Sequence, residues 1–131
     1  MNAQKRVLVV DDDRDFVEMN RVVLENQGFQ VDAAFNGEEA LQKVEESPPD
    51  VIILDVMMDT KSDGFNVTHS LRNDPSTAEI PIIMLTSVNR EVPYRFDKDE
   101  TWLPVDVFLE KPVPPEQLVD QVKKMLVPQT T

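Results

Sequence analysis

Short runs of apolar, often β-branched residues alternate along this chain with longer amphipathic segments. The expected strands are Lys5–Val10, Gln30–Ala34, Val51–Asp55, Ile80–Thr86 and Val105–Lys111. This alternation predicts βαβ units around a parallel sheet rather than a helical bundle or a β-sandwich. Because crossovers between parallel strands are right-handed, we expect a doubly wound, five-stranded α/β fold with strand order 2-1-3-4-5.

The amphipathic segments carry start and stop signals for helices. Helices are expected over Arg14–Gln27 before Gly28, over Glu38–Glu46 after Asn36, over Asp63–Asn73, and from Pro114–Pro115 to Val127. In the first of them, Phe16, Met19 and Val23 recur at helical spacing. Pro93 and Pro104 bound the segment before the last strand, where we expect an irregular or shortened fourth helix because an interior proline costs about 3 kcal/mol.

Composition narrows the class of protein. A chain of 131 residues can bury about two thirds of its unfolded surface, so residues 1–131 are expected to form a single domain with its core at about 5–127. Cysteine is absent, which excludes disulfides, thiol nucleophiles and Cys-based metal sites. No apolar stretch reaches the roughly 18 residues of a membrane span, so a cytoplasmic protein with no membrane partner is expected. The net charge of -12 argues against a nucleic-acid partner.

Charged side chains stand directly at the ends of three expected strands. Asp11 and Asp12 follow the first strand, Asp55 ends the third, and Lys111 ends the fifth. The carboxyl ends of parallel strands meet at one edge of the sheet, where open α/β folds place their sites. Two carboxylates about 4–5 Å apart repel by ~3–4 kcal/mol at an effective dielectric near 20, so either one is protonated or a cation lies between them. Mg²⁺ suits such an oxygen site, whereas the lack of nearby His or Cys disfavours Zn²⁺.

These residues have the chemistry of phosphoryl acceptance. An aspartate beside Mg²⁺ can attack phosphorus and form an acyl phosphate, because the metal neutralises charge on the transferring oxygens. Lys111 and the hydroxyl of Thr86 or Ser87, at neighbouring strand ends, are candidates to bind those oxygens. A nucleophile, a cation site, an ammonium group and a hydroxyl are therefore available together.

Four motifs stand at the ends of expected strands: VLVVDDD at Val7–Asp13, VIILDVMM at Val51–Met58, PIIMLTS at Pro81–Ser87 and FLEKP at Phe108–Pro112. With these motifs the chain resembles the response-regulator receiver domain of two-component signalling, a CheY-like fold of the flavodoxin type. The resemblance covers essentially the whole chain. It implies a stand-alone signalling switch that takes a phosphoryl group from a phosphohistidine of a sensor histidine kinase or histidine phosphotransfer protein. Such a switch catalyses only its own phosphorylation and dephosphorylation, and it acts through a downstream protein target.

The resemblance also implies which residues form the acceptor and the metal site. Asp55 would be the phosphoacceptor. Asp11 and Asp12 would form the acidic pair, with Asp12 a direct Mg²⁺ ligand, and Asp55 and the backbone carbonyl of Met57 would complete the protein ligands. Asp13 is expected to be a helix N-terminal residue that the helix dipole stabilises.

The resemblance also implies which residues bind the phosphoryl group and change conformation in response to it. Thr86 would hydrogen-bond the phosphoryl group and Lys111 would pair with it, while Pro112 would follow a cis peptide bond. Phe108 would be the aromatic switch, whose ring turns inward when the Thr86 hydroxyl moves toward the phosphate. Met57 and Val88 occupy positions that tune attack by water, and their apolar side chains predict slow self-dephosphorylation.

Two segments depart from the family pattern. Asp59 stands where a proline is usual, and the Asp63-Gly64 pair arrives one residue late, so the loop 59–62 is longer and more polar than in most receivers. Trp102–Val105 replaces the usual stretch of small residues before the fifth strand. The second departure affects the surface by which receivers commonly dimerise or bind targets.

Two other functions remain open at this point. One is a pseudo-receiver, an interaction module with the same fold and no phosphoryl chemistry. The other is a haloacid-dehalogenase-like phosphatase, in which Asp11 would be the nucleophile and Asp13 the acid/base. Arg14 and Asp15 lie where that family has small turn residues, which disfavours the phosphatase.

Overall fold

The computed structural model describes residues 5–55, 63–87, 107–111 and 113–126, with the backbone only at 63–66, 86–87, 107–108 and 110–111. The segment predicted to hold an irregular fourth helix lies outside the described residues, as do Met57, Val88 and Pro112. Among the helices that are described, the longest has 13 residues, and none is long and apolar enough to cross a membrane.

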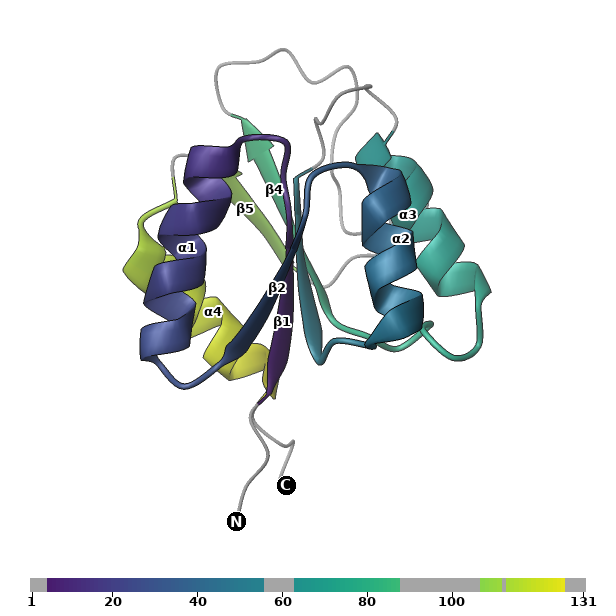
Figure 1. The fold of residues 1–131 in the computed structure, drawn as a ribbon. Coiled ribbons are helices and arrows are strands. Elements are labelled where there is room, and N and C mark those ends of the chain that lie inside the picture. Colours follow the sequence, from purple (N-terminus) through teal and green to yellow (C-terminus); the bar gives the residue numbers. More distant parts are fainter. Residues whose placement is uncertain (1–4, 56–62, 88–106, 112, 127–131) are drawn as a thin grey trace.

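A parallel sheet forms the middle layer of the fold (Figure 1). Its strands are β1 (Arg6–Val10), β2 (Gln30–Ala34), β3 (Val51–Asp55), β4 (Ile82–Ser87) and β5 (Val107–Lys111), in the order β2-β1-β3-β4-β5. All residues of β3 are buried, because helices cover both faces of a parallel sheet. The expected α/β class with a parallel sheet is confirmed.

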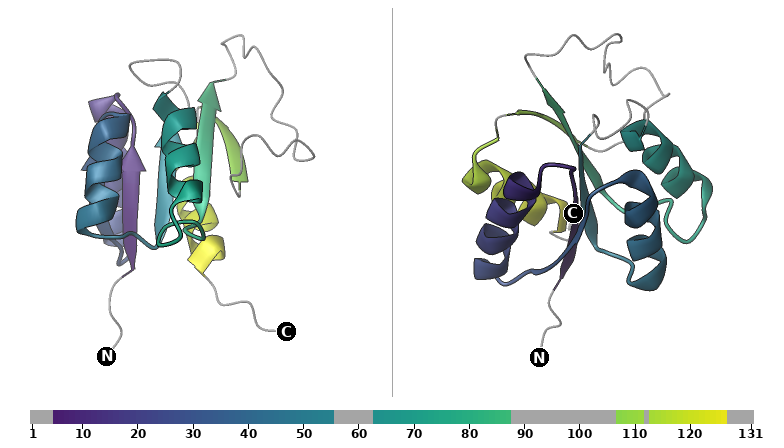
Figure 2. Two further views of the ribbon diagram at one scale, coloured as in Figure 1. Left: turned by 90° about the vertical axis from the view of Figure 1, so that its right-hand side faces the viewer. Right: turned by 45° about the horizontal axis from the view of Figure 1, so that its top comes forward.

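Helices form the two outer layers (Figure 2). The helix pair α1 (Arg14–Asn26) and α4 (Pro115–Leu126) covers one face of the sheet, and α2 (Gly37–Glu46) with α3 (Asp63–Asn73) covers the other (Figure 1). Alternate residues of one strand therefore enter different cores. In β1, Val7 and Val9 pack with Leu118 of α4, whereas Leu8 and Val10 belong to the core under α2 and α3.

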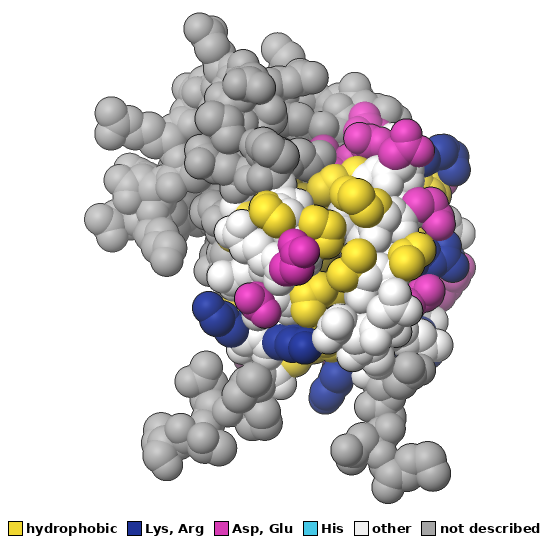
Figure 3. Space-filling model, turned by 90° about the vertical axis from the view of Figure 1, so that its left-hand side faces the viewer, with side chains coloured by type: hydrophobic (Ala, Val, Ile, Leu, Met, Phe, Trp, Pro, Cys, Tyr) yellow, Lys and Arg dark blue, Asp and Glu magenta, His cyan; other side chains and the backbone are white. Residues whose placement is uncertain are grey.

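The buried face of α1 agrees only in part with the one that its apolar spacing indicated: Phe16 and Val23 pack against the core, partly buried. Val17, Asn20 and Leu24 are the buried residues of this helix, whereas Met19 is 48% exposed. Asn20 can face the core because its Nδ2 donates to the backbone carbonyl of Phe16, at 2.8 Å. Figure 3, which views the molecule from the side of α1 and α4, shows apolar side chains gathered among charged ones.

This assignment predicts a contrast in stability between two apolar residues of α1. Leu24→Ala is expected to lower the free energy of unfolding by about 2–5 kcal/mol, because it leaves a cavity under the helix. Met19→Gln is expected to change it by less than about 0.5 kcal/mol, because the side chain already meets water. Urea denaturation of both variants checks this, and equal losses would show that Met19 is a core residue.

The start of β4 is set by contacts of the preceding turn. The expected strand begins at Ile80, but β4 begins at Ile82. One guanidinium nitrogen of Arg72, on α3, donates to the carbonyls of Ala78 (2.9 Å) and Ile80 (2.8 Å). These bonds hold the chain in the α3–β4 turn and delay its entry into the sheet.

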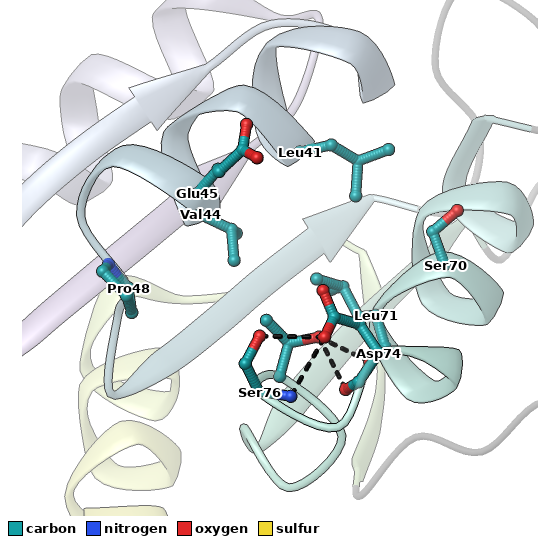
Figure 4. Close-up of a pocket in the computed structure, with 9 residues that line it drawn as sticks. Leu41, Val44, Glu45, Pro48, Ser70, Leu71, Asp74 and Ser76 are labelled. Atoms are coloured by element: carbon teal, nitrogen blue, oxygen red, sulfur yellow. Dashed lines mark hydrogen bonds between the residues drawn. The ribbon is translucent and has the colours of Figure 1, made fainter.

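A groove of ≈ 370 Å³ lies between α2 and α3 and extends to the α3–β4 turn (Figure 4). Leu41, Val44 and Leu71 supply its apolar lining, and Asp74 lies near the end of α3. The Oδ1 atom of Asp74 accepts bonds from the amide (3.0 Å) and hydroxyl (2.9 Å) of Ser76. These bonds stabilise the turn.

Candidate functional site

Three carboxylates meet at the carboxyl edge of the sheet. One carboxylate oxygen from each of Asp11, Asp12 and Asp55 lies within 4.8 Å of the other two. Asp11 and Asp55 are buried, with 0% and 6% exposure, and Asp12 is exposed. We call these three residues the acidic cluster. It unites the three carboxylates that the strand ends predicted.

Strand register places the cluster. Val10 of β1 pairs with Leu54 of β3, so the next residue of each chain segment, Asp11 and Asp55, emerges side by side. The amide of Asp11 also donates to the carbonyl of Ala34 at 3.1 Å, which ties the end of β1 to the end of β2. The position of Asp11 is therefore determined from both neighbouring strands.

The β1–α1 turn is organised by its own aspartates. The amide of Asp13 donates to Oδ1 of Asp11 at 2.9 Å. The Oδ1 atom of Asp13 in turn accepts from the amides of Asp15 (3.1 Å) and Phe16 (3.3 Å), which makes Asp13 the N-cap of α1. The prediction that Asp13 is a helix N-terminal residue is confirmed.

The acidic cluster has the donor set of a hard divalent cation. Because the chosen oxygens of Asp11 and Asp55 lie within 4.8 Å of each other, two charges there repel by at least about 3–4 kcal/mol at an effective dielectric near 20. The carboxylate oxygens come from two strand ends, and Asp12 at the end of β1 is exposed to solvent. The site therefore leaves room for the waters that Mg²⁺ retains. The only histidine of the chain, His69, lies on α3 and is exposed. The residues present therefore fit Mg²⁺.

The remaining expected site residues are placed by their backbone. Asp55 pairs with Leu85 in the β3–β4 register, so Thr86 is the next residue along β4. Ser87 pairs with Lys111, the last residue of β5. Thr86 and Lys111 therefore belong to the same carboxyl edge as the acidic cluster.

Sequence reasoning missed one contact beside this site. The guanidinium carbon of Arg14, the first residue of α1, lies 4.1 Å from the centroid of the Phe35 ring, which follows β2. This distance is typical of a cation–π interaction. The two residues are far apart in sequence and neither belongs to a motif, so no local signal connects them.

Comparison with known proteins identifies the family. A family model described as the response regulator receiver domain matches residues 7–123. The chain belongs to the response-regulator receiver family. The acidic cluster at the carboxyl edge of this receiver domain thus lies in a fold known from signalling proteins.

Individual relatives agree with this assignment. The receiver is 40% identical over 93% of its length to the alkaline phosphatase synthesis transcriptional regulatory protein PhoP of Bacillus subtilis, and 34% identical over 94% to the DNA-binding response regulator MtrA of Mycolicibacterium paratuberculosis. It spans about half of these curated relatives, 48% and 52%. The chemotaxis response regulator CheY4 of Vibrio cholerae superimposes with a TM-score of 0.79 at 29% identity, covering 95% of this chain and 100% of CheY4.

Proposed function

We propose that this receiver accepts a phosphoryl group on Asp55 from a phosphohistidine of a sensor histidine kinase or histidine phosphotransfer protein. The observation that carries the proposal is the juxtaposition of Asp55 with Asp11 and Asp12, all within 4.8 Å. Membership of the receiver family supports the same role. The protein is then a signalling switch whose only chemistry is its own phosphorylation and dephosphorylation.

In the proposed reaction, a carboxylate oxygen of Asp55 attacks phosphorus. A P–O bond forms as the P–N bond of the phosphohistidine breaks, and the imidazole nitrogen keeps the electron pair of that bond. Asp11, Asp12, Asp55 and the Met57 carbonyl would hold Mg²⁺, which supplies positive charge against the transferring oxygens. Burial of Asp55 at 6% exposure limits access of water to the nucleophile.

Lys111 and Thr86 would bind the phosphoryl oxygens once they are attached to Asp55. Their support is the register that places both at the carboxyl edge of the sheet. Phe108 pairs with Met84, two residues before Thr86, so Phe108 and Thr86 occupy positions on the same face of β4 and β5. We propose that these two residues couple phosphorylation to a population shift that changes binding of a downstream protein.

Phosphorylation by a small-molecule donor tests the proposal directly. The purified protein is incubated with acetyl phosphate in Mg²⁺ or in EDTA, and its intact mass is measured. We expect the mass of one phosphoryl group to appear only in Mg²⁺. Absence of any gain in Mg²⁺ would contradict the proposal and favour the pseudo-receiver, an interaction module without phosphoryl chemistry.

The lifetime of the phosphorylated form is a further expected result. Met57 and Val88 offer no polar group to orient an attacking water, so self-dephosphorylation is expected to take minutes or longer. After removal of the donor, intact mass recorded over time gives the decay rate. Decay within seconds would contradict this prediction and leave phosphoacceptance itself intact.

A further inference from the structure

Arg14 is a cation surrounded in sequence by carboxylates that it does not pair with. Asp12, Asp13 and Asp15 flank it, yet its guanidinium forms no ion pair with any carboxylate in the part of the chain that the structure describes. It lies over the Phe35 ring instead, 4.1 Å from the ring centroid. Arg14 is exposed, so packing against other residues does not prevent its side chain from moving.

Arg14 lies close to the acidic cluster along the chain, two residues after Asp12. Arg14 is the first residue of α1, and side chains on a helix lean toward its N-terminus. The N-terminus of α1 follows directly from the turn that carries Asp11 and Asp12. A guanidinium released from the ring would therefore start near these carboxylates, and guanidinium is a strong bidentate partner for a carboxylate.

The Phe35 ring is partly buried and packs against the core cluster that includes Val17 of α1 and Leu118 of α4. The amide of Phe35 donates to Oε1 of Glu39 at 2.9 Å, while the amide of Glu39 donates to Oδ1 of Asn36 at 2.8 Å. These bonds fix the start of α2 through Asn36 and Glu39, as in a capping box. The ring also follows Ala34, whose carbonyl accepts the amide of Asp11. Core packing thus holds the Phe35 ring, and the exposed Arg14 guanidinium lies over it.

We propose that Phe35 holds the Arg14 guanidinium away from the acidic cluster and so keeps these carboxylates available to Mg²⁺. The inference rests on the proposed function, because it concerns the same metal site. Arg14 released from the ring competes with the metal for the carboxylates. An exposed cation–π contact changes an equilibrium constant by about two- to fivefold, which sets the size of the expected effect. Phe35 is a positioning residue in this scheme, and it does not touch the metal.

A double-mutant cycle tests the inference, with Mg²⁺ affinity measured by isothermal titration calorimetry. The proteins are wild type, Phe35→Leu, Arg14→Gln and the double variant, with Phe35→Tyr as the control that keeps a ring. We expect Phe35→Leu to raise the Kd for Mg²⁺ about two- to fivefold, and Phe35→Tyr to leave it unchanged. Arg14→Gln is expected to bind Mg²⁺ at least as tightly as wild type, because the competitor is gone. The double variant should match Arg14→Gln.

The cycle separates this role from general damage to the fold. Weaker Mg²⁺ binding by Arg14→Gln, or an equal loss from Phe35→Leu with and without Arg14, would overturn the inference. Thermal denaturation without metal identifies a variant that fails to fold. If Phe35→Leu fails to fold, Arg14→Gln alone still tests whether Arg14 competes with Mg²⁺ for the carboxylates. Absence of Mg²⁺ binding by wild type would instead contradict the proposed function. If wild type binds Mg²⁺ normally, Asp12→Asn loses this binding and the cycle shows no effect, only the inference about Phe35 is contradicted.

Discussion

Asp55→Asn is expected to abolish phosphoryl incorporation from acetyl phosphate, with no mass gain in Mg²⁺ where wild type is modified. The amide oxygen is a poor nucleophile toward phosphorus, and it carries no charge for the metal to bind. The same substitution is not expected to lower the stability of the protein. Without metal, the substitution removes the repulsion of about 3–4 kcal/mol between the buried charges of Asp11 and Asp55, so the free energy of unfolding is expected to stay level or rise.

Asp74→Asn is the matched control for this experiment. It makes the same chemical change at an exposed turn, where an asparagine oxygen can accept the bonds that Ser76 donates. The control should incorporate phosphate as wild type does. A mass gain that survives Asp55→Asn but disappears in Asp11→Asn would assign the nucleophile to Asp11, as in a haloacid-dehalogenase-like phosphatase, and would contradict the receiver mechanism.

Asp12→Asn is expected to weaken Mg²⁺ binding by about 10- to 100-fold or more. This is the loss seen when even an outer partner of a metal ligand is removed, and Asp12 is proposed to bind the metal directly. Asp12 contributes the solvent-exposed oxygen of the acidic cluster, so its replacement leaves no new buried polar group. Calorimetric titration with Mg²⁺ measures the effect, and metal-free thermal denaturation checks that the fold is retained.

The neighbouring aspartate provides a close control for that variant. Asp13→Asn removes a charge one residue away, but its role is to cap α1, and asparagine caps helices about as well as aspartate. Mg²⁺ affinity and stability should therefore remain near those of wild type. If both variants lose the same affinity, the total charge of the turn governs metal binding, and Asp12 has no special role as a ligand.

Local chemistry explains why much of this fold is predictable. Apolar runs indicated the strands, and Asn36 indicated the start of α2, because a side-chain cap and a run of β-branched residues act within a few residues of the chain. Prediction was weaker where burial of a residue or the start of a strand depends on a polar partner or on a residue distant in sequence. Asn20 is buried in α1 because it bonds the Phe16 carbonyl, and β4 starts late because Arg72 binds the turn before it.

The alternation of strands and helices, the strand order and the strand ends at which carboxylates gather were all predictable from the sequence. The exact register of the strands and the contacts between side chains distant in sequence came from the folded structure. Asp11 and Asp55 meet because β1 pairs with β3, and Arg14 reaches Phe35 because the ends of β1 and β2 are bonded together. Helix caps and strand propensity depend on adjacent residues, whereas register and ring contacts depend on how whole elements pack. The contact of Arg14 with Phe35 is therefore visible only in the folded chain.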